Sequence, residues 1–427
     1  MKTKIEEFYE RLKAGILRTL SANAINKAIG LISSMAITRL LSTEDYGIWS
    51  YSLNLYSYLA MVSGFGLVSG VLQFGAENKG TDKAYSFFKY CTKTGLCIDI
   101  GLVTLFGAAI AMMQLPIDGA KPFVLVILPV LLAEYMNAIG QSILRAQNRI
   151  NEFANFLNAN SALVAIWTCG GALIGLWGVI IGRYLAYLLS IAYLVWLLKR
   201  DIMPIRTADN LESNDKKQLW HYSIFTGASS AMNLVVYSLD ITLIAAMIKN
   251  AEEMALYKVG TLIPNALQFI PTSVVIAVIS NIIYNRDNID WVRKNVKRTY
   301  VGLVFLNIFI IAILLVFSPI IIRIISGEKY LGSVPVLRVL TLGYFFSGTF
   351  RNLSVNVLAA FRRVHFGLFI AILTCLLDVS LNYLLISRFG MIGAAYATFA
   401  VDITAAAISF GYVVYLLRRG TINANSN

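Results

Sequence analysis

Long apolar stretches alternate with short polar connections along almost the whole chain. A helix needs about 20 mostly apolar residues to cross the hydrocarbon core of a bilayer. Several stretches carry Trp or Tyr at their ends, as is usual at the membrane interface. The pattern predicts about twelve transmembrane helices, at residues 18–39, 46–72, 91–114, 122–144, 154–176, 178–198, 222–248, 256–283, 300–325, 334–359, 365–387 and 391–417.

The segment before the first apolar stretch has a different pattern. Ile5, Phe8, Leu12, Ile16 and Leu20 recur there at helical spacing among charged residues. Such an arrangement predicts an amphipathic helix that lies on the inner membrane surface. The segment lacks the features of a cleavable signal peptide.

Basic residues are distributed unevenly among the connections. Of the 36 Lys and Arg, 25 lie at the two ends of the chain and in alternate connections, and 5 lie in the other connections. Cytoplasmic loops of membrane proteins are enriched in Lys and Arg. The asymmetry therefore predicts an even number of spans, with both termini in the cytoplasm. The excess of Lys and Arg in cytoplasmic loops also accounts for the net charge of +13. No basic and aromatic platform lies outside the apolar stretches, so we expect no nucleic-acid partner.

Three short motifs of the first half recur in the same order in the second half, 208, 214 and 215 residues further along. Two parallel repeats of six helices form a transporter architecture, with the substrate path between them. The sequence thus predicts an all-α polytopic membrane protein with two six-helix lobes. The motif pairs are 44–49 with 252–257, 144–149 with 358–363, and 175–178 with 390–393.

The most polar connection lies near the middle of the chain, between Lys199 and Gln218. We take it as the link between the two lobes. The expected organisation is an amphipathic segment at 1–17, an N-lobe at 18–198, a cytoplasmic linker at 199–221, a C-lobe at 222–417 and a cytoplasmic tail at 418–427.

The composition excludes several other classes of protein. With 58% hydrophobic and only 14% charged residues, the chain lacks the charged surface of a soluble domain. The 4 Cys and 2 His have neither disulfide nor metal-site spacing. We find no nucleophile–base pair and no Gly-rich phosphate loop. The sequence therefore predicts no catalytic residue, no resident metal and no cofactor.

Four motifs carry a resemblance to a known family: Thr38–Gly47, Gly64–Leu67, Ala359–Arg363 and Gly390–Thr398. At these residues the chain resembles the polysaccharide-exporter branch of the multidrug/oligosaccharidyl-lipid/polysaccharide superfamily. It is most similar to O-antigen or capsule repeat-unit flippases of the Wzx type. The resemblance covers essentially the whole chain, and its motifs indicate the fold better than the substrate.

The resemblance implies a task in the bacterial inner membrane. Such relatives move an undecaprenyl-diphosphate-linked oligosaccharide from the cytoplasmic to the periplasmic leaflet by alternating access coupled to an ion gradient. The partners it implies are the lipid-linked oligosaccharide, membrane lipids, a polysaccharide polymerase and glycosyltransferases. Lipid II flippases carry two further C-terminal helices. Because the sequence stops at Asn427 after the twelfth apolar stretch, we expect it to lie outside that branch.

A diphosphate-linked sugar needs a wet polar path and positive charge. In this superfamily the lobes meet through the first two helices of each half, and those four segments carry polar stripes at helical spacing. A polar stripe either lines water or joins helices, and an intramembrane Lys or Arg either binds the diphosphate, snorkels to the interface or pairs with an acid. The expected substrate-binding residues are Lys27, Arg39, Lys258, Asn23, Asn54, Asn233, Tyr237 and Asn265.

Acidic residues within the apolar stretches are candidates for ion coupling. Asp240 lies on the polar stripe of the seventh segment, and its alternative role is a static ion pair with Lys27. Asp378 and Asp402, in the last two segments, are expected to form a cation site in the C-lobe. The coupling ion would be H⁺ or Na⁺. We expect structural roles for the other intramembrane charges, which include Asp99, Glu134, Arg183 and Arg351.

Two other functions compete with the flippase hypothesis. A multidrug or organic cation exporter on the same fold would have an acidic, aromatic cavity, whereas Lys27 and Lys258 balance or outnumber Asp240 here. A membrane-embedded glycan polymerase or ligase would carry a large periplasmic loop with catalytic Arg or His. The outward connections of this chain are all short, which argues against such an enzyme.

Overall fold

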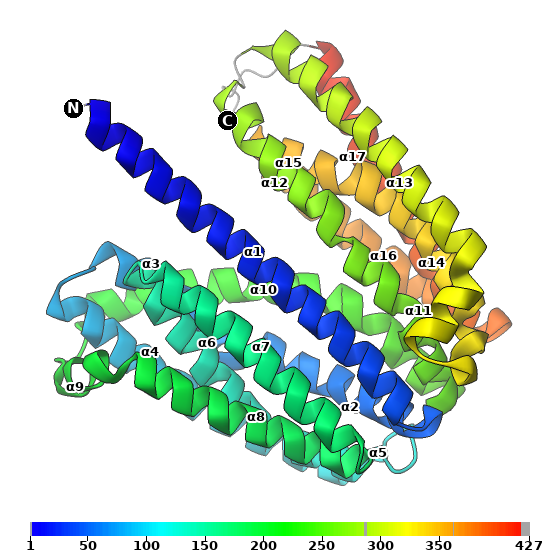
Figure 1. Ribbon diagram of the computed structural model, residues 1–427, viewed down its shortest axis with the longest axis horizontal. Coiled ribbons are helices and arrows are strands. Elements are labelled where there is room, and N and C mark those ends of the chain that lie inside the picture. Colours follow the sequence, from blue (N-terminus) through cyan, green and yellow to red (C-terminus); the bar gives the residue numbers. More distant parts are fainter. Residues whose placement is uncertain (1, 286–287, 362, 420–427) are drawn as a thin grey trace. The chain divides into compact units, whose positions relative to one another are not determined.

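The computed structural model describes residues 2–285, 288–361 and 363–419 of the 427 residues. Within these ranges the regular elements are all helices, as Figure 1 shows, which confirms the all-α prediction. Eight of the described helices are long and apolar enough to cross a membrane, or nine if one bent pair counts as a single span. The predicted segments missing from this set also lie on helices, namely α1 (Lys2–Leu40), α7 (Ile150–Ala172) and α10 (Ser213–Ile248).

The chain divides into two compact units, Met1–Ser238 and Leu239–Asn427. The division falls within α10, so the segment predicted to open the C-lobe begins in the first unit. The region predicted as a linker contains a short helix, α9 (Lys199–Thr207), and the start of α10. The remaining helices of the first unit are α2 (Thr43–Met61), η1 (Ser63–Gly66), α3 (Leu67–Glu77), α4 (Asp82–Met112), α5 (Ala120–Ile127), α6 (Val130–Ala146) and α8 (Leu176–Leu197).

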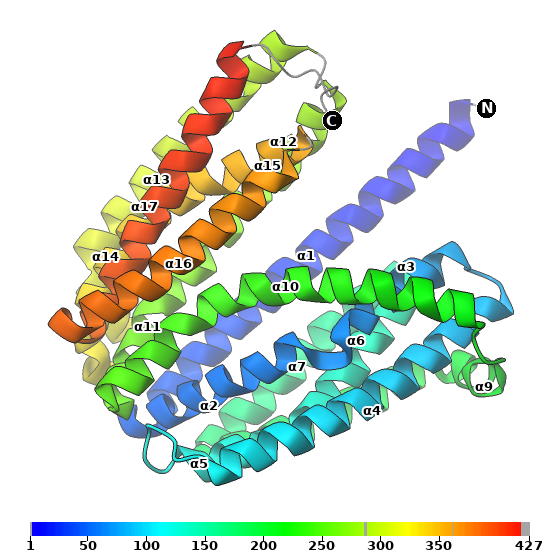
Figure 2. The same cartoon turned by 180° about the vertical axis from the view of Figure 1, so that it is seen from behind.

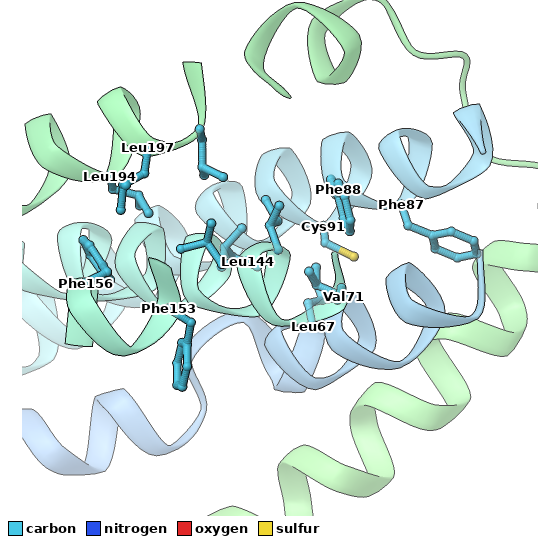
Figure 3. Close-up of a cluster of buried hydrophobic side chains, with 14 of the residues drawn as sticks. Leu67, Val71, Phe87, Phe88, Cys91, Leu144, Phe153, Phe156, Leu194 and Leu197 are labelled. Carbon is cyan, nitrogen blue, oxygen red and sulfur yellow. The ribbon is translucent and has the colours of Figure 1, made fainter. Parts of the chain in front are cut away.

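The core of the first unit collects apolar side chains from α3, α4, α6, α7 and α8 (Figure 3). Phe88 of α4 and Phe156 of α7 are almost fully buried there, and Phe74 stacks on Phe87 at 5.2 Å between ring centroids. Burial of such large apolar side chains stabilises the packed helices by about 1.5–3 kcal/mol each in soluble proteins, and by less when lipid is the alternative environment.

Local hydrogen bonds define where several helices begin. Ser42 caps α2, because its Oγ accepts from the Asp45 amide at 3.0 Å. Asn250 caps α11 (Ala251–Leu267), where its Oδ1 accepts from the amides of Glu252 and Glu253 at 2.8 and 3.2 Å. Acidic residues follow both caps, which suits the positive end of the helix dipole. Each cap lies two residues before one member of the repeated motif pair at 44–49 and 252–257.

The second predicted span is broken at Ser63–Gly66, where α2 and α3 meet at 40°. Gly64 and Phe65 have positive φ angles of 53° and 44°. The buried carboxylate of Asp99, on α4, accepts from Ser63 Oγ at 2.7 Å and from the Gly64 amide at 2.8 Å. A carboxylate thus satisfies the donors that the break exposes.

Gly66 brings α3 against the backbone of α10. A Cβ atom on Gly66 would lie 2.1 Å from the Ser223 carbonyl oxygen and 2.9 Å from the Gly227 nitrogen. Only glycine fits so close to another backbone. The first part of α10 is therefore held tightly to the first unit, and the same helix continues to Ile248 in the second unit.

The second unit contains the end of α10 and two pairs of helices joined by bends or irregular turns. Figure 2 shows α16 (Val364–Phe389) beside α17 (Met391–Arg419). A π-helical turn, η3 (Ser347–Arg351), interrupts the span made by α14 (Val334–Phe346) and α15 (Asn352–Ala360). Such turns often occur at functional sites. The other elements are α11, α12 (Phe269–Tyr284), α13 (Ile289–Ile325) and η2 (Glu328–Ser333).

Candidate functional site

Asp240, near the end of α10, is surrounded by hydrogen-bond donors from three other helices of the second unit. Tyr257 Oη on α11 donates to Asp240 Oδ2 at 2.6 Å. Thr398 Oγ1 on α17 lies 3.0 Å from the same oxygen and 3.0 Å from the Ala394 carbonyl oxygen. Asn382 Nδ2 on α16 donates to Asp240 Oδ1 at 3.0 Å. These neutral donors hold the carboxylate in one orientation.

Asn382 joins Asp240 to a second carboxylate. Its Nδ2 also lies 3.1 Å from Asp378 Oδ1, one helical turn earlier on α16. Both Asp378 and Asn382 are buried, with 3% and 0% of their surface exposed. One amide therefore bridges two carboxylates inside the unit. Amides carry no charge, so this bridge does not neutralise either acid.

Two oxygen atoms of this cluster have no hydrogen-bond donor within the described part of the chain. They are Asp378 Oδ2 and Asn382 Oδ1, both buried. Buried polar atoms are nearly always satisfied, and exceptions often mark the place of an ion or water. Together with Asp240 and Thr398, these atoms form a set of oxygen ligands of the kind that a hard cation prefers.

A third carboxylate is close to this cluster and has its own cation. Asp402 Oδ1 on α17 lies 3.4 Å from Arg351 Nη1, and the side chains are 16% and 31% exposed. Arg351 is the last residue of the π-helical turn η3. Asp378 interacts electrostatically with Asp240, Asp402 and Arg351. The wide turn thus places the guanidinium beside an acid at the edge of the cluster.

The charge of the cluster is incompletely compensated. Lys258 on α11 interacts electrostatically with Asp240, and Arg351 pairs with Asp402, but Asp378 makes no ion pair within the described residues. Repulsion between two neighbouring carboxylates is strong in a low-dielectric interior. Binding a proton or a monovalent cation would remove it. No group of three or more His, Cys, Asp or Glu that could hold a metal ion occurs in the described ranges.

The structure therefore brings together the three acids that the sequence identifies as ion-coupling candidates. Sequence reasoning missed Asn382 and Tyr257 and identified Thr398 as the last residue of a family motif. Helical spacing held a usable signal, since Asn382 follows Asp378 by four residues and Asp402 follows Thr398 by four. Residues with that spacing share one face of a helix. Only the packing of α10 and α11 against these faces reveals the roles of Tyr257 and Asn382.

Two of the expected substrate residues on α1, Asn23 and Lys27, lie on its exposed face, and so does Arg39 near its end. These side chains are thus exposed rather than packed between helices of the first unit. Such exposure is what a cavity lining requires. Asn54 on α2 is different, because it is 6% exposed and its Nδ2 donates to the Ser238 carbonyl oxygen at 2.9 Å. For the polar stripe on α2, this bond is an example of the alternative role, in which a polar side chain joins two helices.

In the second unit Asn265 is exposed and Lys258 is half-buried. The side chains of Asn233 and Tyr237 lie outside the described residues, although their backbone belongs to α10. The binding roles of all eight substrate residues stay predictions.

The first unit has a charged cluster of its own, built around Arg183 on α8. Arg183 Nη2 donates to Glu134 Oε1 on α6 at 2.9 Å, and Tyr187 Oη donates to the same oxygen. The guanidinium carbon also lies 5.9 Å from the ring centroids of Trp49 and Tyr56, which is within range of cation–π attraction. This carboxylate has a full counter-charge inside its own unit.

An all-helical fold with several long apolar helices and acids set among them defines a class, the multi-pass membrane transporters and flippases. Solved structures support that fold. The chain is similar to the lipid II flippase MurJ in an inward closed conformation, with a TM-score of 0.72 and 17% identity over 96% of this chain and 94% of the other. It is equally similar to an inward-facing multidrug resistance MATE transporter of the MOP superfamily, with a TM-score of 0.71 and 13% identity over 94% and 96% of the two chains.

A transporter from Pyrococcus furiosus, described as a MOP superfamily member whose binding pocket has reversed polarity, gives a TM-score of 0.60 at 15% identity, over 95% and 96% of the chains. Residues 12–283 match the model of a family described as polysaccharide biosynthesis protein, and the chain belongs to that family. The family and the fold are those of transporters and flippases rather than catalytic enzymes. Both agree with the resemblance found in the sequence.

One curated relative was also found, an uncharacterized membrane protein of Methanocaldococcus jannaschii. It is 35% identical over 89 residues, which cover 21% of this chain and 17% of the relative. The match therefore spans only about a sixth of that protein's length.

Proposed function

We propose that this protein flips an undecaprenyl-diphosphate-linked oligosaccharide repeat unit from the cytoplasmic to the periplasmic leaflet of the inner membrane, with both of its termini in the cytoplasm. Transport proceeds by alternating access and is coupled to a cation that binds between Asp240 and Asp378. The observation that carries the coupling is the pair of carboxylates bridged by Asn382, with one buried oxygen of Asp378 left unsatisfied. The family match supports the class of cargo.

The site suggests how a cation gradient does work. Without a cation, Asp240 and Asp378 repel each other and share only neutral donors. A bound H⁺ or Na⁺ compensates this charge and draws α10 and α16 together through their carboxylates. A ligand shifts a conformational equilibrium by its differential affinity for the two states. The cation therefore favours the conformation in which these helices are packed, and its release allows the other.

The cargo part of the proposal rests on basic side chains of α1 and α11. Lys27 on the exposed face of α1 would bind the diphosphate, with Arg39 and Lys258 as further candidates. Phosphates are bound well by Lys and Arg in partly dehydrated sites. Lys27→Ala should abolish the display of surface glycan in cells that depend on this protein, while the amount of inserted protein stays normal. Normal glycan at normal protein levels would overturn the cationic site.

A charge-matched control is Lys79→Ala, because Lys79 lies in a predicted cytoplasmic connection. It should leave glycan display unchanged. For coupling, Asp240→Asn in proteoliposomes should slow flipping and change its dependence on an imposed Na⁺ or H⁺ gradient. An unaltered gradient dependence would exclude Asp240 as the coupling residue.

Export of an organic cation is the second candidate, because the similarity to a multidrug transporter is as high as that to a lipid II flippase. The assay that separates the two is efflux of a fluorescent organic cation by cells that express the protein. Efflux that requires Asp240 and is indifferent to Lys27 would favour the exporter.

A further inference from the structure

A groove between α12 and α13 in the second unit is separate from the ion site and from the polar stripes. It encloses about 430 Å³. Its lining residues recur at helical spacing on one face of each helix, so both helices present a continuous wall. The wall residues are Val274, Val278 and Asn281 on α12, and Trp291, Asn295, Arg298, Thr299, Gly302, Leu303 and Leu306 on α13.

The groove is polar at one end and apolar at the other. Asn281, Asn295 and Arg298 lie at the end that the sequence predicts to be cytoplasmic, and Leu303 and Leu306 lie further along α13. From residue 291 to 306 the helix rises about 22 Å, which is about half the thickness of a bilayer with its headgroups. The polarity and length of the groove match one phospholipid molecule in a single leaflet.

Arg298 gives the polar end its charge. It is exposed and makes no ion pair within the described residues, whereas Arg293 on the same helix pairs with Asp290 at 3.2 Å. Guanidinium groups bind phosphate oxygens through paired hydrogen bonds. Basic pockets between transmembrane helices at the cytoplasmic side recognise anionic headgroups. The nearby Lys294 and Lys297 add to the positive potential of this end.

A second hollow provides a contrast. It lies between α2 and α4 in the first unit, encloses about 310 Å³ and is lined by Tyr58, Leu59, Val62, Leu102, Leu105, Phe106 and Ala109. These lining residues carry no charge, so acyl chains would fill this hollow without selecting a headgroup. Of these two hollows in the described part of the chain, the groove beside Arg298 is the one that combines an apolar wall with a cation.

We propose that the groove between α12 and α13 binds one anionic phospholipid of the surrounding bilayer, with its phosphate on Arg298 and its acyl chains along Leu303 and Leu306. Phosphatidylglycerol is the test lipid and phosphatidylcholine the neutral comparison. Native mass spectrometry of the full-length protein, titrated with either lipid in detergent, should show one site that prefers phosphatidylglycerol about tenfold. A charge-assisted contact of ordinary strength has about this effect.

Arg298→Gln should remove the tenfold preference, and Lys297→Gln should keep it, because Lys297 carries the same charge one residue earlier but does not line the groove. Gly302→Leu should eliminate the site for both lipids. A Cβ at Gly302 meets no atom within 4 Å, so the leucine side chain fills the groove without distorting the helix. Gly411→Leu, at an equally open glycine on α17, is the matched control.

Several results would overturn the proposal. An Arg298→Gln variant that still prefers phosphatidylglycerol tenfold would exclude the headgroup contact. Competition by millimolar inorganic phosphate would show a simple anion site. Displacement of phosphatidylglycerol by an equal concentration of undecaprenyl diphosphate would assign the groove to the cargo. Lipid binding that survives Gly302→Leu would place the lipid elsewhere.

Discussion

Glu134 of the first unit and Asp378 of the second are intramembrane acids in opposite electrostatic situations. In the first unit Glu134 has the guanidinium of Arg183 at 2.9 Å, and Asp99 accepts from Ser63 and the Gly64 amide. In the second unit Asp240 and Asp378 share the amide of Asn382, and Asp378 keeps an unsatisfied oxygen. Acids of the first kind hold helices together. Acids of the second kind are suited to reversible binding of a cation.

The largest expected effect is on the stability of the first unit. Arg183→Ala would leave the half-buried Glu134 without its counter-charge, which should lower the free energy of unfolding by about 3 kcal/mol. Chemical unfolding of the purified protein in detergent measures this loss. The double variant Arg183→Met with Glu134→Gln should recover most of it, because no unpaired charge remains. Equal stability of Arg183→Ala and the wild type would show that the pair is not structural.

Removal of an acid from the second unit should have the opposite sign. Asp378→Asn ends the repulsion between Asp378 and Asp240, so the cation-free protein should become more stable, by about 1 kcal/mol. Stabilisation by added Na⁺ or by acid should disappear, as thermal unfolding in NaCl and choline chloride at several pH values would show. Glu134→Gln is the matched control and should destabilise the protein. Loss of stability in Asp378→Asn would mean that this acid is structural too.

A smaller effect is expected at the bridging amide. Asn382→Leu keeps the volume but removes the donor to both carboxylates and one oxygen ligand. Apparent cation affinity in the transport assay should fall about tenfold. Asn307 provides the control. It is a buried asparagine whose Nδ2 donates to Thr349 Oγ1 at 2.8 Å, and not to one of the three acids. Asn307→Leu should destabilise the protein without changing cation affinity, and an equal change in both variants would sink the role of Asn382.

The smallest effect is expected at Tyr257. Tyr257→Phe removes one of the donors to Asp240 and leaves Thr398 and Asn382 in place. This donor stabilises the cation-free carboxylate by about 1 kcal/mol, so its loss should make the cation affinity about fivefold stronger. Tyr300→Phe is the control, because Tyr300 Oη bonds to Ser354 Oγ at 2.7 Å and contacts no carboxylate among the residues that the structure describes. A fivefold change in that control as well would make the effect nonspecific.

Much of the fold follows from apolar stretches that are long enough to span a membrane, because the bilayer leaves few alternatives to helices. The irregular points could not be predicted in the same way. The break at Ser63–Gly66 depends on Asp99, 33 residues after Gly66. The π-helical turn at Ser347–Arg351 has no sequence signature in the pattern of apolar positions. Both depend on contacts that only folding creates.

The candidate site shows the same limit. An acid in an apolar stretch is costly, so Asp240, Asp378 and Asp402 could be identified one by one. Their assembly could not, because polar stripes do not specify which helices pack together. Asn382 and Tyr257 are ordinary polar residues until α10, α11 and α16 meet around one carboxylate.

The helix that carries Asp240 belongs to both units, which bears on the proposed ion site. Gly66 holds the early part of α10 so close that no Cβ atom fits between the backbones, and α10 runs unbroken from there to Asp240 and beyond. A flexible loop would absorb a small twist, but a continuous helix transmits torque. Under the proposed coupling, a cation at Asp240 would therefore act on one part of a helix whose earlier part is packed tightly within the first unit.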